Sequence, residues 1–424
     1  MIEIPPLPAT AKEPACLVGF DLPANVVDGR NVSLEELKAL ADTADIEPAG
    51  MFVCKRFGAD PATFIGSGKV AEITAFCHAR EIHLVLFDHD LSPVQCRNLE
   101  EAFQGKVIDR TALILEIFAR RARTREGQLQ VECAQLEYLL PRLTNLWSHL
   151  SRQYGGAGTR GPGEKQLEVD RRRVQSRLRH LHDLLEEIRC QRATQRKRRQ
   201  RSDIPVVAIV GYTNSGKSTL MHTLTKADVL VENKLFATLD PTTRTHHLPS
   251  GECYLFSDTV GFIRNLPHAL VEAFKATLEE VHQADVLLHI ADASAADVDS
   301  QLAAVHAVLG ELDADQKPQV LALNKVDLLS HQAKKAIQER FPDAALISAQ
   351  YKYGFADLFA RLRAATPLKR LRTRLRLPPH KSYLLSQLYA QGKVLSVDYQ
   401  QEVIVVDAFV PEALQQETRR YRSP

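Results

Sequence analysis

The sequence has few cysteines, and their spacing suits neither a disulfide framework nor a zinc ribbon. The seven are odd in number and widely separated, and no two form a CxxC pair. Both kinds of scaffold need cysteines in pairs, so neither is predicted, and a reducing compartment is favoured. The cysteines are Cys16, Cys54, Cys77, Cys96, Cys133, Cys190 and Cys253.

Membrane-targeting features are also lacking. The first residues, MIEIPP, contain no base, and no uninterrupted apolar run is long enough to span a bilayer. We therefore expect a cytoplasmic protein. A basic helix, described below, leaves peripheral association with a membrane open.

Net charge is low overall but unevenly distributed. The chain has 424 residues and a formal charge of +2, a length that predicts two or three domains. Sixteen basic and six acidic residues lie between positions 142 and 201, a net charge of +10 for that stretch. Such a block indicates a polyanionic partner such as RNA, and a solvated helical surface is the alternative.

Residues 1–122 predict a small α/β domain with a mainly parallel sheet, because short apolar runs alternate with amphipathic ones. Strands are expected at 17–20, 51–54, 83–87 and 106–108, and helices over 34–44, 69–80 and 94–103. Within this domain, Gly66-Ser67-Gly68-Lys69 looks like part of a phosphate loop. Thr63 stands where the first glycine is required, so we predict a tight turn into a helix, and a weak anion site stays open.

Residues 123–202 predict an antiparallel helical hairpin. Apolar residues recur at three- and four-residue steps over 126–150 and again over 167–188. A glycine-rich connector, 155–163, would form the tip, and the second arm could extend about 50 Å. Basic residues near the tip suit contact with phosphates, and an ordinary connecting loop is the alternative. They are Arg152, Arg160, Lys165, Arg171, Arg172 and Arg173.

Residues 203–366 contain a complete phosphate-loop pattern, GxxxxGK[ST], directly after an apolar run at 204–210. A helix is expected to begin near Lys217 and to point its positive end at the anion. Lys217 would reach the β- and γ-phosphates, and the Ser218 hydroxyl would ligate Mg²⁺. The loop consists of Gly211, Tyr212, Thr213, Asn214, Ser215, Gly216, Lys217 and Ser218.

Three later motifs indicate guanine as the base and a Ras-like mixed sheet as the fold. They are Asp258-Thr259-Val260-Gly261, Asn324-Lys325-Val326-Asp327 and Ser348-Ala349-Gln350, each following an apolar run. The Asp327 carboxylate can accept hydrogen bonds from guanine N1–H and N2–H, for which adenine has no equivalent. Asn324 would hold the base and the loop, Lys325 would cover the base, and the Ala349 N–H would meet O6.

The switch elements predict slow hydrolysis in isolation. Asp258 should bind Mg²⁺ through water, and the Gly261 N–H should sense the γ-phosphate. In Phe236-Ala237-Thr238-Leu239-Asp240, Thr238 is the expected second Mg²⁺ ligand, with Thr242 and Thr243 as rivals. Lys217, Thr238 and Gly261 are therefore the catalytic candidates. Phe262 stands where signalling GTPases carry a water-orienting glutamine, so a partner must accelerate turnover.

Residues 367–424 predict a small α+β domain. Strands are expected over 370–376, 394–399 and 402–407, and a helix over 383–391, because apolar and polar positions alternate in the strands. The arginines of the first strand give it a basic face.

These motifs together resemble the HflX family of translational GTPases over nearly the whole chain. The resemblance rests on residues 154–164 (YGGAGTRGPGE), 166–172 (QLEVDRR), 211–219 (GYTNSGKST) and 236–241 (FATLDP). It implies a front half that binds the large ribosomal subunit and its rRNA, and a GTPase that the ribosome stimulates. Splitting or rescue of stalled ribosomes under stress is the implied role.

The resemblance carries the GTP, GDP and Mg²⁺ contacts over onto the motif positions named above. Gln350 departs from the usual lysine, which affects packing on the base but not the Ala349 contact. We expect a monomer with no DNA partner. Two alternatives stay open: a ribosome-assembly GTPase, and an RNA-remodelling ATPase or passive RNA-binding protein with an adenine site near residues 66–69.

Overall fold

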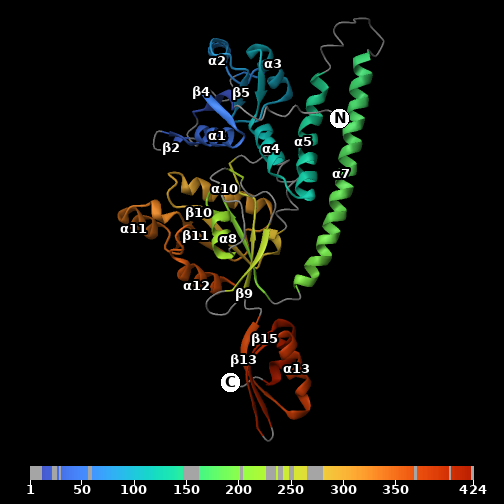
Figure 1. Ribbon diagram of the computed structural model, residues 1–424, viewed down its shortest axis with the longest axis vertical. Coiled ribbons are helices and arrows are strands. Elements are labelled where there is room, and N and C mark those ends of the chain that lie inside the picture. Colours follow the sequence, from blue (N-terminus) through green and yellow to red (C-terminus); the bar gives the residue numbers. More distant parts are fainter. Residues whose placement is uncertain are drawn as a thin grey trace.

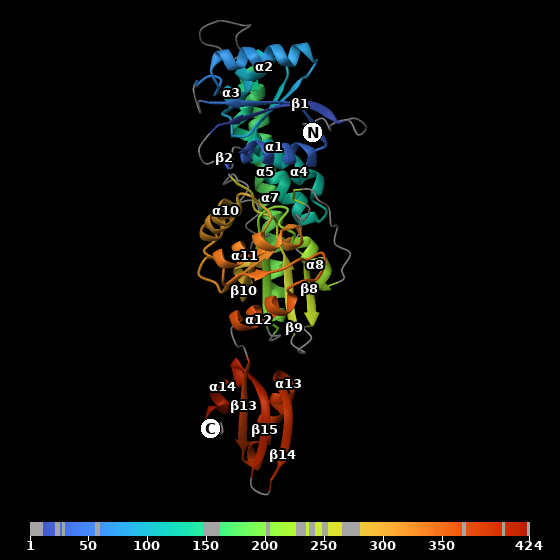
Figure 2. The same ribbon diagram turned by 90° about the vertical axis from the view of Figure 1, so that its left-hand side faces the viewer.

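Three main sheets follow one another along the long axis of the computed structural model (Figure 1). The structure describes residues 12–21, 26–27, 30–55, 60–146, 162–200, 204–225, 235–236, 242–247, 253–264, 280–366, 370–400 and 403–421. A four-stranded sheet lies at one end and a three-stranded sheet at the other, as the second view confirms (Figure 2). A six-stranded sheet lies between them.

The four-stranded sheet has the order β4-β1-β5-β6, and all its described pairings are parallel. Residues 15–20 of its β1 strand are all buried, as is usual for a parallel strand covered on both faces. The predicted parallel α/β fold is therefore confirmed. Its strands are β1 (Glu13–Phe20), β4 (Ile46–Cys54), β5 (Leu84–Phe87) and β6 (Lys106–Ile108), and a two-stranded ribbon adds β2 (Val26–Val27) and β3 (Arg30–Asn31).

Local sequence explains where the helices around this sheet begin. Asn31 caps the first helix by accepting a hydrogen bond from the Leu34 N–H, and Ser92 and Gln95 form a capping box on the third. Sequence reasoning missed the fourth helix, which Asp109 caps and which buries an apolar face. The helices are α1 (Val32–Thr43), α2 (Ser67–Ala79), α3 (Pro93–Phe103) and α4 (Arg110–Arg121).

The helical hairpin consists of α5 (Arg125–Leu146) and α7 (Pro162–Gln200), which lie side by side and run antiparallel (Figure 1). Leu129 and Cys133 of α5 are buried against Leu181 and Leu185 of α7, which is the seam that the spacing predicts. Residues 155–161 of the expected tip lie outside the described residues. The 39-residue α7 extends past α5 to the level of the six-stranded sheet (Figure 1).

The six-stranded sheet has the order β12-β11-β10-β7-β9-β8 and is mixed, because β8 alone pairs antiparallel among its described strands. This arrangement confirms the predicted GTPase-type fold. Its strands are β7 (Val206–Gly211), β8 (Thr242–His247), β9 (Cys253–Asp258), β10 (Val286–Asp292), β11 (Gln319–Asn324) and β12 (Ala345–Leu346). Its helices are α8 (Lys217–Thr225), α10 (Val298–Glu311), the 3₁₀ turn η2 (Val326–Leu328), α11 (His331–Arg340) and α12 (Phe355–Ala365).

The last sheet is antiparallel with the order β13-β15-β14, and confirms the predicted small α+β fold. In its first strand Leu375 and Leu377 are buried whereas Arg374 and Arg376 are exposed, as the alternation predicts. The elements are β13 (Arg370–Leu377), η3 (Pro379–Lys381), α13 (Ser382–Gln391), β14 (Lys393–Tyr399), β15 (Ile404–Pro411), α14 (Glu412–Thr418) and η4 (Arg419–Tyr421). Among the helices described across the chain, none is long and apolar enough to cross a membrane.

Candidate functional site

The candidate site lies where β7, β9 and β11 end, at the carboxyl edge of the six-stranded sheet. The phosphate loop joins β7 to α8 there, and two of its glycines are required by close backbone approach. A Cβ on Gly211 would lie 2.1 Å from the Ile290 carbonyl oxygen, and one on Gly216 would lie 2.2 Å from Asn324 Nδ2. Both residues also have positive φ, 151° and 95°. The glycines of the motif are thus needed for the shape of the loop.

Lys217 is buried at the centre of this loop. Its Nζ donates to the carbonyl oxygens of Gly211 at 3.0 Å and of Tyr212 at 2.7 Å. Burial lowers the pKa of Lys217 to about 8, against the opposing pull of Asp258. A Cβ on Gly261 would lie 2.9 Å from the same Nζ, so the lysine and Gly261 face one another.

Ser218 and Asp258 bring two oxygen donors together beside the loop. The Ser218 hydroxyl donates to Asp258 Oδ2 at 3.0 Å, and Asp258 is fully buried at the end of β9. Hydroxyl and carboxylate oxygens are the ligands that Mg²⁺ prefers. The pair is therefore suited in chemistry to a hard divalent cation.

Two buried hydroxyls of the loop lack protein partners. Among the described residues, Thr213 Oγ1 and Ser215 Oγ are buried without any hydrogen-bond partner. A buried polar atom left unsatisfied costs about 1–3 kcal/mol. A polar ligand that satisfies these hydroxyls would remove that cost, so the loop fits an oxygen-rich anion.

Asn324 connects three separate segments at the site. Its Nδ2 donates to the Ser215 carbonyl at 2.9 Å, and its Oδ1 accepts from the Ala349 N–H at 2.9 Å. The phosphate loop, the end of β11 and the loop after β12 are thereby held in one position. Sequence reasoning placed the Ala349 N–H on guanine O6, whereas here it is bonded to Asn324.

The other residues of the NKxD and Ser-Ala-Gln motifs border the same region. Lys325 has a φ of 62° and its Nζ lies 2.7 Å from Asp292 Oδ2. Val326 is buried, whereas Asp327 in η2 is exposed, so its carboxylate is accessible to a base. Ser348 is buried, and its hydroxyl accepts from the Tyr351 N–H at 3.3 Å; Gln350 is exposed.

The segment between the phosphate loop and β8 is described only in part. Phe236 is buried, and its ring packs edge to face on Phe118 of α4, with centroids 4.7 Å apart. Ala237, Thr238, Leu239 and Asp240 lie outside the described residues, so the role predicted for Thr238 stays a prediction. The rival candidates Thr242 and Thr243 are the first residues of β8.

Residues 259–262 lie directly against the phosphate loop. Thr259 is fully buried and donates to the Ile209 carbonyl at 2.7 Å, and Val260 is buried beside it. Phe262 N donates to the Gly211 carbonyl at 3.1 Å, and its own carbonyl accepts from Thr213 N at 2.7 Å. The Phe262 side chain is buried in the apolar core, so it cannot orient water.

A polar network that sequence reasoning missed joins this site to the four-stranded sheet. The phenol of Tyr212, in the phosphate loop, donates to the Glu36 carboxylate on α1 and accepts from the Arg264 N–H at 2.9 Å. Burial, then Glu36, raises the pKa of Tyr212, so the phenol keeps its proton. The motif gave no signal for this contact, because position 212 is unrestricted in the GxxxxGK[ST] pattern.

Arg110 lies at the centre of the network and is almost fully buried. Its guanidinium lies 2.6 Å from Asp88 Oδ1 and 2.6 Å from Glu36 Oε2, and it donates to the Arg264 carbonyl at 3.1 Å. Burial alone would lower the pKa of Arg110, but the two carboxylates raise it, so the group stays charged. The phosphate loop is thus bonded to α1 and the segment after Gly261 to α4, two helices of the first α/β domain.

A phosphate loop after a buried strand, an NKxD motif at the end of β11 and a mixed six-stranded sheet define a P-loop GTPase. Three family models match consecutive parts of the chain: "GTP-binding GTPase N-terminal" over residues 31–119, "GTP-binding GTPase Middle Region" over 121–199 and "50S ribosome-binding GTPase" over 206–325. In chain order, these matches cover most of the first α/β domain, the hairpin, and the GTPase domain from β7 to Lys325.

Relatives identify the family. The GTPase HflX of Caldanaerobacter subterraneus subsp. tengcongensis is 45% identical over 92% of this chain and 90% of its own, and that of Escherichia coli K12 is 45% identical over 84% of each. A solved structure described as SsGBP with GDP aligns over 84% of this chain and 98% of its own at 24% identity, with a TM-score of 0.47, too distant to support a functional argument. The chain belongs to the HflX family of GTPases, and it is a GTP hydrolase.

Proposed function

We propose that this GTPase binds the large ribosomal subunit, hydrolyses GTP faster when bound there, and uses the cycle to split or rescue stalled ribosomes under stress. The observation that carries the proposal is the network of Tyr212, Glu36 and Arg110, which ties the phosphate loop to the front half of the chain. A ribosomal subunit bound by residues 1–202 could therefore change the position of the phosphate loop through these contacts. The matched description "50S ribosome-binding GTPase" supports the same partner.

The proposed division of labour follows the chain. Residues 1–122 form an α/β domain and 123–202 a hairpin, and together they contact rRNA. Residues 203–366 bind and hydrolyse GTP, and 367–424 form a small domain at the opposite end (Figure 2). We place the protein in the cytoplasm as a monomer.

In the proposed binding mode, the phosphate loop wraps the triphosphate with its backbone N–H groups. Lys217 exchanges its two carbonyl partners for β- and γ-phosphate oxygens, which are better acceptors for an ammonium group. Gly261, which faces that lysine, donates its N–H to the γ-phosphate. Mg²⁺, when bound, neutralises developing phosphate charge. Ser218 and Thr238 would hold it, with Asp258 acting through water.

Guanine would lie against the NKxD and Ser-Ala-Gln loops. The exposed Asp327 carboxylate accepts from N1–H and N2–H, and Lys325 covers one face of the ring. Asn324 and Ala349 are bonded to one another at this edge, and the Ala349 N–H would share or exchange that bond to meet guanine O6. The base thus meets a preformed edge, because these loops are bonded together before it arrives.

The ribosome supplies what the site lacks. Phe262 is buried at the position after Gly261, so the attacking water has no side chain there to orient it. A group from the partner, or a segment that the partner orders, must do this instead. Groups supplied in this way raise GTPase rates by several orders of magnitude in other systems.

GTP turnover measured with and without purified large subunits tests the proposal. We expect slow turnover alone and an increase of at least about tenfold on the subunit. Whole ribosomes incubated with protein and GTP should separate into subunits on a sucrose gradient. Fast turnover in isolation that ignores added subunits would contradict the proposal, and altered precursor particles instead of split ribosomes would indicate an assembly factor.

The exposed bases of α7 should contribute to subunit binding. Arg171, Arg172 and Arg173 are exposed on its first turns. Changing Arg171 and Arg172 to Gln should weaken subunit binding. The slope of log affinity against log salt concentration should decrease by roughly 1 for each lost phosphate contact. Turnover in isolation should not change. Adding Arg160→Gln should extend the loss.

A double variant at Lys335 and Lys352 is the matched control. Both lysines are exposed, and both lie in the C-terminal half of the nucleotide domain, distant in sequence from the basic stretch of α7. Removing the same charge there should leave subunit affinity nearly unchanged. Equal losses in the two variants would show a non-specific charge effect and not a binding face.

Asp327→Asn should change base preference. The substitution places an amide donor where the carboxylate accepted a hydrogen bond. The lost hydrogen bonds to the charged group are worth about 3 kcal/mol, so GTP affinity should fall roughly 100-fold. Xanthosine triphosphate carries a carbonyl at the matching position and should become the better ligand. Competition of both nucleotides against a fluorescent GDP analogue measures this, and unchanged preference would remove Asp327 from the base site.

A further inference from the structure

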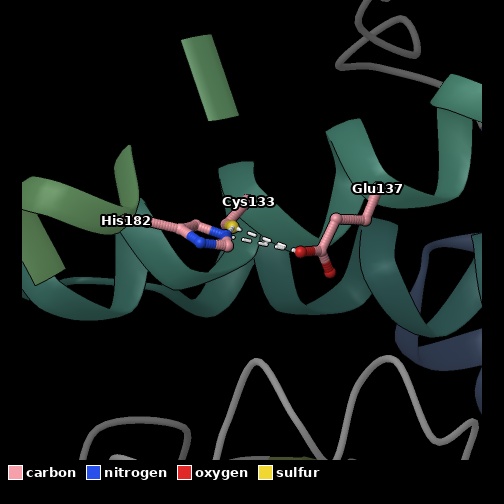
Figure 3. Close-up of side chains that lie close together, drawn as sticks. All are labelled: Cys133, Glu137 and His182. Carbon is pink, nitrogen blue, oxygen red and sulfur yellow. Dashed lines mark hydrogen bonds and ion pairs between the residues drawn. The ribbon is translucent and has the colours of Figure 1, made fainter. Parts of the chain in front are cut away.

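We propose that Cys133, Glu137 and His182 form a binding site for one Zn²⁺-class cation between the two helices of the hairpin. The three side chains converge from α5 and α7 (Figure 3). Among the residues that the structure describes, no other cluster brings three such ligand atoms within 4.8 Å of one another. Nothing in the GTPase chemistry uses these residues.

The distances between the three atoms match one face of a zinc tetrahedron. His182 Nε2 lies 3.1 Å from Cys133 Sγ and 3.4 Å from Glu137 Oε1, and Sγ lies 3.8 Å from Oε1. Zinc bonds of about 2.3 Å to sulfur and about 2.0–2.1 Å to nitrogen or oxygen, set at tetrahedral angles, separate the ligands by roughly 3.3–3.6 Å. Shifts of a few tenths of an ångström would therefore complete the site.

The mixture of donors selects the class of metal. A thiolate, an imidazole and a carboxylate together suit Zn²⁺ and its neighbours, whereas Mg²⁺ and Ca²⁺ prefer oxygen alone. With thiolate and carboxylate both ionised, the two negative charges balance the cation. The side chain of His182 is 59% exposed, so a water molecule can reach the fourth position.

The helices hold the ligands in place before a cation arrives. Cys133 and Glu137 are four residues apart and so lie on one face of α5. Cys133 is buried beside Leu129, Leu181 and Leu185, and Arg177 of α7 pairs bidentately with Glu132 of α5 at 2.7 and 2.9 Å. Packing and the ion pair thus fix the separation of the two helices next to the trio.

A hydrogen-bonded trio with no affinity for metal is the competing explanation. Burial and the nearby Glu137 raise the pKa of Cys133 to about 12, so without a cation the thiol keeps its proton and faces Glu137. A bound cation would displace that proton, as thiolate ligation does in other proteins. The two explanations differ in whether added metal is bound.

The test uses the full chain, stripped with a chelator and then given excess Mg²⁺ and GDP to fill the nucleotide site. Zn²⁺ is titrated by calorimetry, and Co²⁺ is added as a spectroscopic probe. We expect one tight equivalent of Zn²⁺, a thiolate-to-cobalt charge-transfer band with the strong visible absorption of tetrahedral Co²⁺, and a higher melting temperature on metal addition.

Cys133→Ser and His182→Ala should each lower Zn²⁺ affinity at least about tenfold and remove the tetrahedral Co²⁺ spectrum. Cys190→Ser and His180→Ala, at exposed positions of α7, are the matched controls. Each should retain the Zn²⁺ affinity and the Co²⁺ spectrum of the unaltered chain. Circular dichroism and melting in chelator show that each variant is folded. No Zn²⁺ binding by the intact chain, or binding unaffected by Cys133→Ser, would overturn the proposal and leave a hydrogen-bonded trio only.

Discussion

Lys217→Ala is expected to abolish GTP turnover and to weaken nucleotide binding by roughly 100- to 1000-fold. The ammonium group is buried among backbone carbonyls, so a water molecule in its place would not supply the positive charge that the phosphates require. Each hydrogen bond from a charged donor contributes about 1.5–3 kcal/mol, and the lysine would make at least two to the triphosphate. Fluorescence titration with a labelled GDP analogue and phosphate release give the two numbers.

Lys217→Arg should fail nearly as badly, because Nζ is buried and a Cβ on Gly261 would already lie 2.9 Å from it, which indicates little space for the larger guanidinium. Lys335→Ala on the exposed face of α11 is the control and should behave as the unaltered chain. Nucleotide affinity within about twofold of normal in Lys217→Ala would show that phosphates do not bind at this loop.

Arg110→Met is expected to destabilise the protein by about 3–5 kcal/mol. The substitution approximately keeps the volume but leaves the fully buried Asp88 and the partly buried Glu36 without their cation. Removing one partner of a buried ion pair costs about this much in other proteins. It also removes the bond to the Arg264 carbonyl. Denaturant unfolding monitored by circular dichroism measures the change.

Arg120→Met on the same helix is the matched control. Arg120 is partly exposed and pairs with Glu116 at 3.0 Å, so its loss should cost less than about 1 kcal/mol. Equal effects of the two substitutions would mean that the buried network adds nothing to the contact between the first sheet and the GTPase.

The nucleotide motifs could be predicted from sequence because their chemistry demands particular residues at short spacing. Gly211 and Gly216 are required by close approach of the backbone, and Asn324 by two hydrogen bonds. The fold class followed from strands and helices in alternation. The α4 helix was missed although its cap at Asp109 was readable, because the elements expected within residues 1–122 stopped at the strand over 106–108.

Contacts between distant segments could not be predicted from one sequence. Tyr212 and Glu36 are 176 positions apart, and only the packing of the first sheet on the GTPase brings them together. Cys133 and His182 are 49 positions apart, so the spacing of cysteines along the chain gives no sign of their contact. In both cases the contact depends on how two parts of the chain align when they pack: the first α/β domain on the GTPase domain, and α5 on α7. No local sequence pattern encodes that alignment.

The length of α7 has a mechanical consequence. Its 39 residues make a rod of about 58 Å, and five residues after its end the chain enters β7, the strand that presents the phosphate loop. A tilt of about 5° at one end displaces the other by about 5 Å over such a rod. A small rotation of α7 where the chain enters the amino end of β7, at the edge of the sheet opposite the phosphate loop, would therefore displace the start of α7 by more than the length of one peptide unit.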